Sequence, residues 1–476
     1  MQEHELQGLA KKIKRAACET RTLELKSAAG GSPSKLYDTL SSFSNQDDGG
    51  IIVFGIDEKS GFLSVGVLNA QELMKSVNEQ CKQMTPIVRP LFTVAEVDGK
   101  QIVSAEIPGA DISDRPVFYS GKGRLKGSYV RVGDSDEPMT EYEIYSYDAY
   151  RRRVKDDVRP IEGTGKGDLD TDKTAEFLKK VREQKPKLAR LSDGEILKLT
   201  GIVKEDKLTV TGLLVLGRYP QAVLPQFAMT AIVVPGTEIG DTDKDGSRFI
   251  ANKRIEGTLD EMLDEARRFV ARNMRVKTII DRDGVRKDKD EYPLTAVREA
   301  LLNSLMHRDY SIHTEGSPIR IVMYYDRIEI TNPGGLYGRL TIDNLGKTQA
   351  DTRNQTLATV LEGTGLAENR YSGIPTIRRE MREAGLPDPK FETMRGDFIV
   401  TFYNGQADKK GEGSSIEDRL IEFCEMPKTR TEIAGFIGKT QYYTLKTYVE
   451  PLVESGKLRL LIPNVPKSRN QKYVKV

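Results

Sequence analysis

A polar triad at helical spacing is the feature of this sequence that most limits how the chain can fold. Glu299, Asn303 and His307 recur every four residues. On an α-helix that spacing places the three side chains on one face and spreads the intervening leucines over the others. A carboxylate, an amide and an imidazole aligned in this way can contact the same ligand. The alternative is an amphipathic helix whose polar side chains are solvated.

Two glycine-bearing turns follow this predicted helix. Asn332 begins an Asn-Pro-Gly-Gly turn that contains Gly334 and Gly335, and Gly373 lies in a later turn after Tyr371. Glycine allows a backbone to approach a ligand closely. A polar helix face followed by two such turns predicts one ligand-binding site.

Glu-x3-Asn on a helix, followed by a strand and a glycine turn, resembles the nucleotide-binding fold of gyrase B, heat-shock protein 90, histidine kinases and MutL (the GHKL class). The resemblance implies an ATP site in which Glu299 acts on a water and Asn303 binds Mg²⁺. The expected contacts for ATP and Mg²⁺ are Asn303, His307, Asn332, Gly334, Gly335 and Gly373. Asn332 replaces the aspartate with which the family reads adenine, and Tyr371 replaces a glycine of the lid turn. We therefore expect ATP binding with little or no hydrolysis.

Length and composition predict a cytoplasmic, multidomain α+β protein. The 476 residues suggest about three domains, and the net charge of only +2 means that any nucleic-acid binding comes from local patches. Cys18, Cys81 and Cys424 are too far apart in the sequence for a zinc motif or a disulfide framework. The polar N-terminus lacks the features of a signal peptide, and the apolar runs are too short to span a membrane.

The pattern of elements divides the chain into five segments. They are a mixed α/β domain (1–155), a linker leading into a solvated helix (156–187), a middle α/β segment (188–290), the GHKL-like α/β sandwich (291–404), and a small C-terminal unit (416–476). Leu6–Cys18 is predicted to be a basic amphipathic helix, and Asp98-Gly99 a hairpin turn. Ile51–Asp57 is predicted to be a buried strand, and Leu213–Leu216 is predicted to be a strand.

Four motifs in the first segment resemble the Schlafen/AlbA-type nucleic-acid-binding domain. In chain order they are Glu24-Leu-Lys, Phe43-Ser-Asn, the run from Gly49 to Asp57, and Tyr129-Val-Arg-Val-Gly. The resemblance implies DNA or RNA as a partner. The cations expected to contact phosphates are Lys26, Arg89, Arg115, Arg124, Lys126 and Arg131. The alternative is that these cations are solvated.

A metal-dependent endoribonuclease is an alternative function for this domain. Glu19, Glu24 and Asp57 match carboxylates that form the active site of Schlafen-type ribonucleases. Three converging carboxylates would need Mg²⁺ or Mn²⁺ between them. We favour a domain that binds without cutting, in which these side chains are ordinary surface charges.

The C-terminal unit has the order of a winged helix, with three short helices before a hairpin. Its candidate DNA contacts are Tyr443, Lys446, Lys467 and Arg469. The whole arrangement resembles bacterial Schlafen/AlbA-type transcriptional regulators. We therefore expect a nucleic-acid-binding regulator with a nucleotide ligand and no membrane association. A pure protein-interaction scaffold is the third alternative, and a homo-oligomer is left open.

Overall fold

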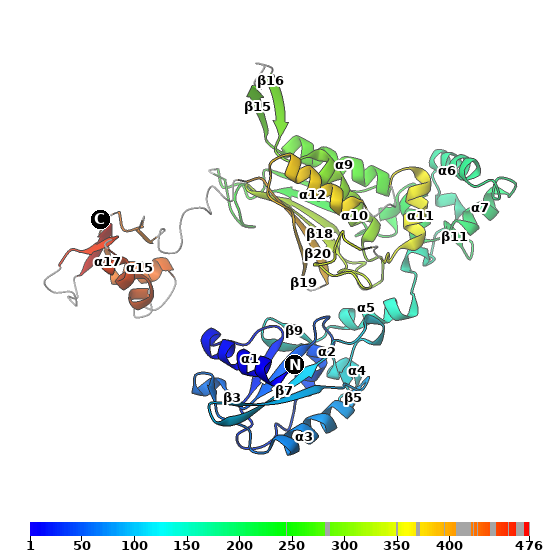
Figure 1. Cartoon of the computed structure of the whole chain (residues 1–476). Coiled ribbons are helices and arrows are strands. Elements are labelled where there is room, and N and C mark those ends of the chain that lie inside the picture. Colours follow the sequence, from blue (N-terminus) through cyan, green and yellow to red (C-terminus); the bar gives the residue numbers. More distant parts are fainter. Residues whose placement is uncertain are drawn as a thin grey trace.

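The computed structural model describes the chain except for residues 244, 281–285, 349–350, 368–371, 395, 406–419, 422, 426, 438–443, 456, 463–470 and 476. Figure 1 shows an N-terminal module, a larger central unit and a small C-terminal unit. Sheets and helices alternate throughout, so the chain is a multidomain mixed α/β protein.

The N-terminal module is built on a four-stranded mixed sheet with helices on both faces. The strands run in the order β1 (Leu23–Lys26), β2 (Gly50–Phe54), β7 (Lys100–Ile107) and β6 (Leu91–Val97). The helix α1 (Glu3–Ala16) packs on one face through Leu6, Ala10 and Ile13. The helices α2 (Tyr37–Ser44) and α3 (Ala70–Lys82) cover the other face.

Short elements complete this module. The pairs are β3 (Ile56–Asp57) with β4 (Leu63–Ser64), β5 (Met84–Thr85) with β8 (Phe118–Tyr119), and β9 (Tyr129–Val132) with β10 (Ser135–Pro138). The helices are α4 (Gly123–Gly127) and α5 (Glu141–Arg152). The predicted hairpin at Asp98 and Gly99 is confirmed, with both residues at positive φ. The strand expected over Ile51–Asp57 is divided at Gly55, where φ is +95°.

The central unit contains one six-stranded sheet. Its order is β14 (Ala251–Ile255), β13 (Met229–Val233), β17 (Ile319–Met323), β18 (Arg327–Pro333), β20 (Asp397–Tyr403) and β19 (Lys390–Met394). The helices α9 (Leu259–Asn273), α10 (Leu294–His307) and α12 (Gly373–Glu383) form a layer against it (Figure 1). Strands from before and after residue 290 therefore share one sheet, so the boundary expected at that point falls inside a single structural unit.

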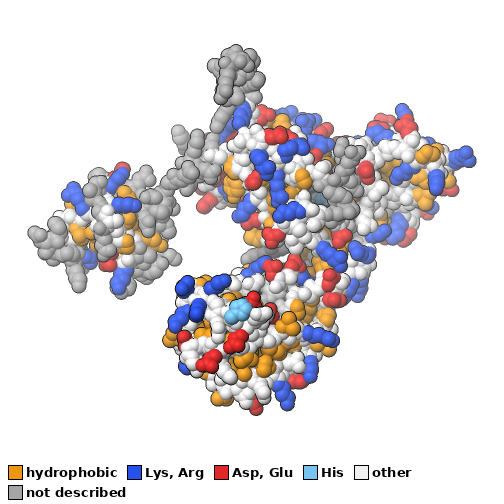
Figure 2. Space-filling view, in the orientation of Figure 1, with side chains coloured by type: hydrophobic (Ala, Val, Ile, Leu, Met, Phe, Trp, Pro, Cys, Tyr) orange, Lys and Arg blue, Asp and Glu red, His pale blue; other side chains and the backbone are white. Residues whose placement is uncertain are grey.

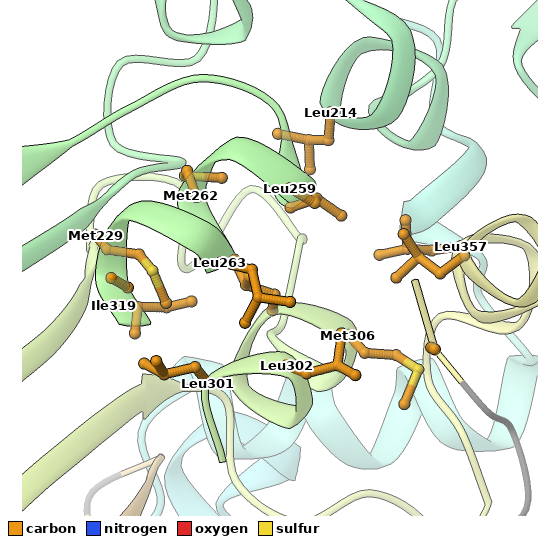
Figure 3. Close-up of a cluster of buried hydrophobic side chains, with 14 of the residues drawn as sticks. Leu214, Met229, Leu259, Met262, Leu263, Leu301, Leu302, Met306, Ile319 and Leu357 are labelled. Atoms are coloured by element: carbon orange, nitrogen blue, oxygen red, sulfur yellow. The ribbon is translucent and has the colours of Figure 1, made fainter. Parts of the chain in front are cut away.

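The central unit contains further elements beyond this sheet and its helix layer. They are α6 (Thr171–Gln184), α7 (Asp193–Leu199), α8 (Val210–Leu216), α11 (Gln355–Thr364), and the strand pairs β11 (Val203–Lys204) with β12 (Lys207–Leu208) and β15 (Val276–Ile280) with β16 (Arg286–Asp290). Figure 3 shows side chains of α8, α9, α10 and β13 meeting in one apolar core, among them Leu214, Met262, Leu301 and Met229.

Two elements differ from the sequence predictions. Leu213–Leu216 belongs to a helix, α8, rather than a strand, and every residue of α8 is buried. A helix buried all round has no amphipathic period, so a short apolar run cannot be distinguished from a buried strand. The helix expected to be solvated, α6, buries Phe177, Leu178 and Val181 in the central core because α11 packs beside it.

The C-terminal unit contains a three-stranded sheet in the order β21 (Lys428–Thr429), β23 (Lys472–Lys475) and β22 (Leu458–Leu460). Its described helices are α15 (Arg430–Ile437), the π-helix η6 (Leu445–Val449) and α17 (Glu450–Glu454). Tyr371, Tyr443, Lys467 and Arg469 lie outside the described residues. In the described part of the chain, no helix is long and apolar enough to cross a membrane.

Candidate functional site

A pocket lies between α10, β18, the segment that follows β18, and the start of α12. Its cavity volume is about 160 Å³, whereas one water molecule needs about 10–15 Å³. The pocket can therefore hold much more than a single water. The structure brings together at this pocket all seven residues of the expected nucleotide site: Glu299, Asn303, His307, Asn332, Gly334, Gly335 and Gly373.

The helix α10 supplies the polar wall. Its other faces bury Ala296, Leu301 and Leu305, and it packs against α9 and α12. Burial of these apolar positions turns the polar stripe toward the pocket. The Glu299 carboxylate accepts a hydrogen bond of 3.0 Å from its neighbour Arg298.

Asn303 lies against the first residue of α12. A Cβ at Gly373 would be 2.8 Å from the Asn303 amide nitrogen, so only glycine fits there without moving the amide. No side chain caps the N-terminus of α12. The backbone N–H groups of its first turn and the positive end of its helix dipole favour an anion, and the amide oxygen of Asn303 beside them is a hard ligand.

Asn332 supplies a buried acceptor at the apolar side of the pocket. The residue is 4% exposed, and its Oδ1 has no hydrogen-bond partner among the described residues. Ile330, Phe398 and Val400 line the same side. An apolar surface with one unsatisfied acceptor suits a flat ring that carries a donor.

His307 is held in its neutral form. Burial, followed by the positive charge of Arg353, lowers its pKa to about 4. The imidazole at the end of α10 is therefore uncharged at neutral pH and can both donate and accept a hydrogen bond.

The two glycines of the first turn have different surroundings. Gly334 has a φ of +108°, and a Cβ there would lie 2.7 Å from the Cβ of Asp309. A Cβ at Gly335 would have no atom within 4 Å. Gly334 is thus required by the packing of the turn on Asp309, whereas Gly335 leaves open space beside the pocket.

Several residues at this site were not predicted from the sequence. Arg353 lines the pocket and forms a buried ion pair with Asp309. The hydroxyl of Tyr142, from α5, donates a hydrogen bond of 2.7 Å to the same carboxylate. These three residues are far apart in the chain and belong to no motif, so no local signal in the sequence identifies them.

Most of the expected phosphate-contacting cations of the N-terminal module are engaged by carboxylates. The Arg131 side chain is only 1% exposed and pairs with Glu24 at 2.8 Å and Asp136 at 2.9 Å. The Arg115 side chain is 8% exposed and pairs with Asp47. The expectation that Arg131 and Arg115 face phosphates is therefore wrong, because both guanidinium groups are enclosed.

The other expected cations are more accessible. Arg124 pairs with Asp148 at 2.7 Å, and Lys26 pairs with Glu24. Arg89 and Lys126 are exposed and have no ion pair within the described part of the chain. Lys446, in the C-terminal unit, lies in the π-helix η6.

The outer face of α1 carries cations that were not assigned a role. Lys11, Lys12 and Arg15 are exposed and form no ion pair with any described residue. Figure 2 shows Lys and Arg side chains gathered over this helix. The basic amphipathic helix predicted in this region from the sequence already indicated a cationic outer face.

The three carboxylates of the nuclease alternative have separate partners. Glu24 lies between Arg131 and Lys26, Glu19 accepts a hydrogen bond of 2.7 Å from the backbone of Leu25, and Asp57 binds the Ser60 hydroxyl. No group of His, Cys, Asp or Glu side chains among the described residues, which include all three, is arranged to hold a metal ion. The convergence that the ribonuclease alternative requires is therefore not found.

Comparisons with known proteins identify three matched segments. Residues 19–140 match the family profile described as "Schlafen, AlbA_2". Residues 316–402 match the profile "Putative ATP-dependent DNA helicase recG C-terminal", and residues 148–230 match a domain of unknown function, DUF8451. No curated protein matches the chain.

Two solved structures are similar to parts or all of the chain. The crystal structure of the DIP2311 protein from Corynebacterium diphtheriae is 18% identical, covers 100% of this chain and 97% of its own, and has a TM-score of 0.40. The N-terminal domain of a putative ATP-dependent DNA helicase RecG-related protein from Nitrosomonas europaea is 24% identical. It covers 28% of this chain and 92% of its own, with a TM-score of 0.23.

Proposed function

We propose that this protein is a nucleic-acid-binding transcriptional regulator whose pocket binds ATP, or a related nucleotide, with Mg²⁺ and with little or no hydrolysis. The observation that carries the proposal is the pocket itself. It brings Glu299, Asn303 and Asn332 together with the N-terminus of α12.

The residues present fit the separate parts of a nucleotide. The unsatisfied Oδ1 of Asn332 can accept a hydrogen bond from the amino group of adenine, whose ring would lie against Ile330 and Phe398. The N–H groups at the start of α12 would bind phosphate oxygens. Asn303 would hold Mg²⁺, which would neutralise charge on the phosphates.

We expect slow hydrolysis because two residues depart from the pattern of the GHKL class. Asn332 stands where that class has the aspartate that reads adenine, and Tyr371 stands where the lid turn has a glycine. Binding without turnover suits a regulator in which the nucleotide acts as a signal.

Two regions support nucleic-acid binding. The N-terminal module matches a Schlafen/AlbA_2 profile over residues 19–140 and presents the unpaired cations of α1. In the C-terminal unit, α15, η6 and α17 lie between the strand β21 and the strands β22 and β23 of one small sheet. This order is compatible with a winged helix, and we propose that the unit contacts DNA through η6 and the strands that follow. Both surfaces would contact the phosphate backbone through lysine and arginine.

The test of the nucleotide site is titration calorimetry of the full chain with Mg-ATP. Asn303→Ala should weaken binding by about tenfold, the loss of one ligand to a charged group. The matched control is Asn273→Ala, since Asn273 ends α9 and bonds its own helix at Phe269. Equal affinities for the wild type and Asn303→Ala would remove the assigned role. Rapid phosphate release that Glu299→Gln abolishes would show that the protein is an ATPase.

A further inference from the structure

The helix α5 contacts both the N-terminal module and the wall of the pocket. On the module side, Asp148 pairs with Arg124 at 2.7 Å, and α5 packs against the 3-10 turn Ile112–Asp114. On the pocket side, Tyr142 donates to Asp309, and Tyr150 donates to Asp351 at 3.3 Å. One rigid helix therefore connects a nucleic-acid module to residues that line the pocket.

Close backbone approaches fix α5 on this wall. A Cβ at Gly396 would lie 2.7 Å from the Tyr142 ring, and a Cβ at Gly338 would lie 3.0 Å from the Tyr150 ring. The Tyr150 ring also packs edge-on against Tyr337, with 5.4 Å between centroids. Both Tyr337 and Asp351 line the pocket. The packed rings leave little room for the wall to move unless α5 moves with it.

Arg353 is the cation of this wall. Its side chain is 9% exposed, it lines the pocket, and its Nε has no hydrogen-bond partner among the described residues. Its Nη1 pairs with Asp309, and its Nη2 donates to the Gly335 carbonyl at 3.3 Å. A guanidinium that lines a cavity is suited to an anionic group of a ligand.

We infer that Arg353 contacts the anionic part of the ligand, and that the chain Arg353–Asp309–Tyr142 couples occupancy of the pocket to nucleic-acid binding by the N-terminal module. The inference rests on the proposed nucleotide site. An anion beside Arg353 draws the guanidinium toward itself and weakens its pairing with Asp309. The freed carboxylate then accepts a stronger hydrogen bond from the Tyr142 hydroxyl, which shifts α5. The shift of α5 changes the affinity of the N-terminal module for nucleic acid. Thermodynamic linkage requires the reverse effect to be equal in size.

The coupling is measured by nucleic-acid affinity of the full chain with and without ligand. Labelled duplex DNA and labelled single-stranded RNA would be titrated by fluorescence anisotropy in the presence of Mg-ATP, adenosine or buffer. Mg-ATP should change the wild-type Kd by about fivefold or more, and adenosine by less than about twofold, because only ATP carries the anionic group. In Tyr142→Phe the effect of Mg-ATP should fall below about twofold, while the Kd for Mg-ATP alone stays within about threefold.

A tyrosine on the same helix provides the control. Tyr145→Phe also removes one hydroxyl from α5, but that hydroxyl bonds Asp156 at 2.8 Å rather than Asp309. It should retain the wild-type response to Mg-ATP. Equal responses in the wild type and Tyr142→Phe, or loss of the response in both variants, would overturn the coupling through Asp309.

The contact with Arg353 is tested separately. Arg353→Gln should lose about tenfold or more in affinity for Mg-ATP and little for adenosine. Equal losses for both ligands would overturn the anionic contact. Because the substitution breaks a buried pair, hydrogen exchange of the unaltered protein is the second measurement. Mg-ATP, but not adenosine, should alter exchange in residues 334–338 and in α5. Failure of the wild type to bind Mg-ATP at all would instead remove the proposed nucleotide site and the inference with it.

Discussion

The guanidinium of Arg131 lies 2.8 Å from the carboxylate of Glu24 inside the N-terminal module, with side-chain exposures of 1% and 8%. Asp136 completes the cluster on the other side of Arg131, at 2.9 Å. In this arrangement Arg131 is enclosed and does not face phosphate, and the Glu24 carboxylate is paired with Arg131 and Lys26. The cluster joins β1 to β9 and is a structural element of the module.

Removal of Arg131 should lower the free energy of unfolding of the module, because Arg131 is an internal ion-pair partner and not a surface charge. Arg131→Gln leaves Glu24 and Asp136 without their shared cation, which we expect to cost about 3–5 kcal/mol in the free energy of unfolding. Urea denaturation followed by circular dichroism measures the loss. The exposed Lys126 is the control, and Lys126→Gln should change stability by less than about 0.5 kcal/mol. Equal stabilities for the two variants would contradict a structural role for Arg131.

The cations of α1 should carry much of the salt dependence of nucleic-acid binding. Each phosphate contact contributes about 0.9 to the slope of log affinity against log salt for duplex DNA. Lys11→Gln, Lys12→Gln and Arg15→Gln combined should therefore reduce that slope by about 2–3. Anisotropy titrations over a range of salt concentrations measure it. Lys75→Gln with Lys82→Gln, on α3 at the other face of the sheet, should leave the slope unchanged, and an equal reduction there would locate binding away from α1.

Gly334 and Gly335 form a matched pair for testing the turn. In Gly334→Ala the alanine would have to adopt the positive φ of this position, and its methyl group would lie 2.7 Å from the Asp309 Cβ. We therefore expect the free energy of unfolding to fall by about 2–4 kcal/mol. Gly335→Ala meets no atom within 4 Å and should cost less than about 1 kcal/mol. Thermal unfolding of both variants provides the comparison. Should Gly334→Ala prove as stable as Gly335→Ala, the close contact with Asp309 would be incorrect.

Local patterns in the sequence predicted the local parts of the site. The i, i+4 spacing of Glu299, Asn303 and His307 was sufficient to predict a helix with one polar face, and Asp98-Gly99 was sufficient to predict a hairpin. Arg353 and Asp309 could not be predicted, since their pairing depends on how the segment after β18 folds back onto the end of α10. The burial of charged side chains could not be predicted either. Arg131 and Lys126 carry the same positive charge, and only the tertiary structure shows that Arg131 is enclosed and Lys126 is exposed.

His307 should make stability fall as the solution becomes acidic. Its pKa of about 4 in the folded chain lies below the ordinary value of about 6.5, so the folded state binds fewer protons than the unfolded state between these two pH values. The neutral ring therefore contributes stability that is complete above about pH 6.5 and is lost as the pH falls toward 4. Since the ring is partly open to the pocket, we expect a loss of about 1–2 kcal/mol by about pH 5.

Replacement of His307 isolates this contribution. His307→Gln cannot titrate, so its free energy of unfolding should fall less than that of the wild type between about pH 7.5 and about pH 5, by the same 1–2 kcal/mol. Urea denaturation at several pH values gives both curves. His4→Gln, at an exposed position on α1, should follow the wild-type curve. Parallel curves for the wild type and His307→Gln would show that the imidazole beside Arg353 is not held neutral, and that the charge at this end of the pocket differs from the one described.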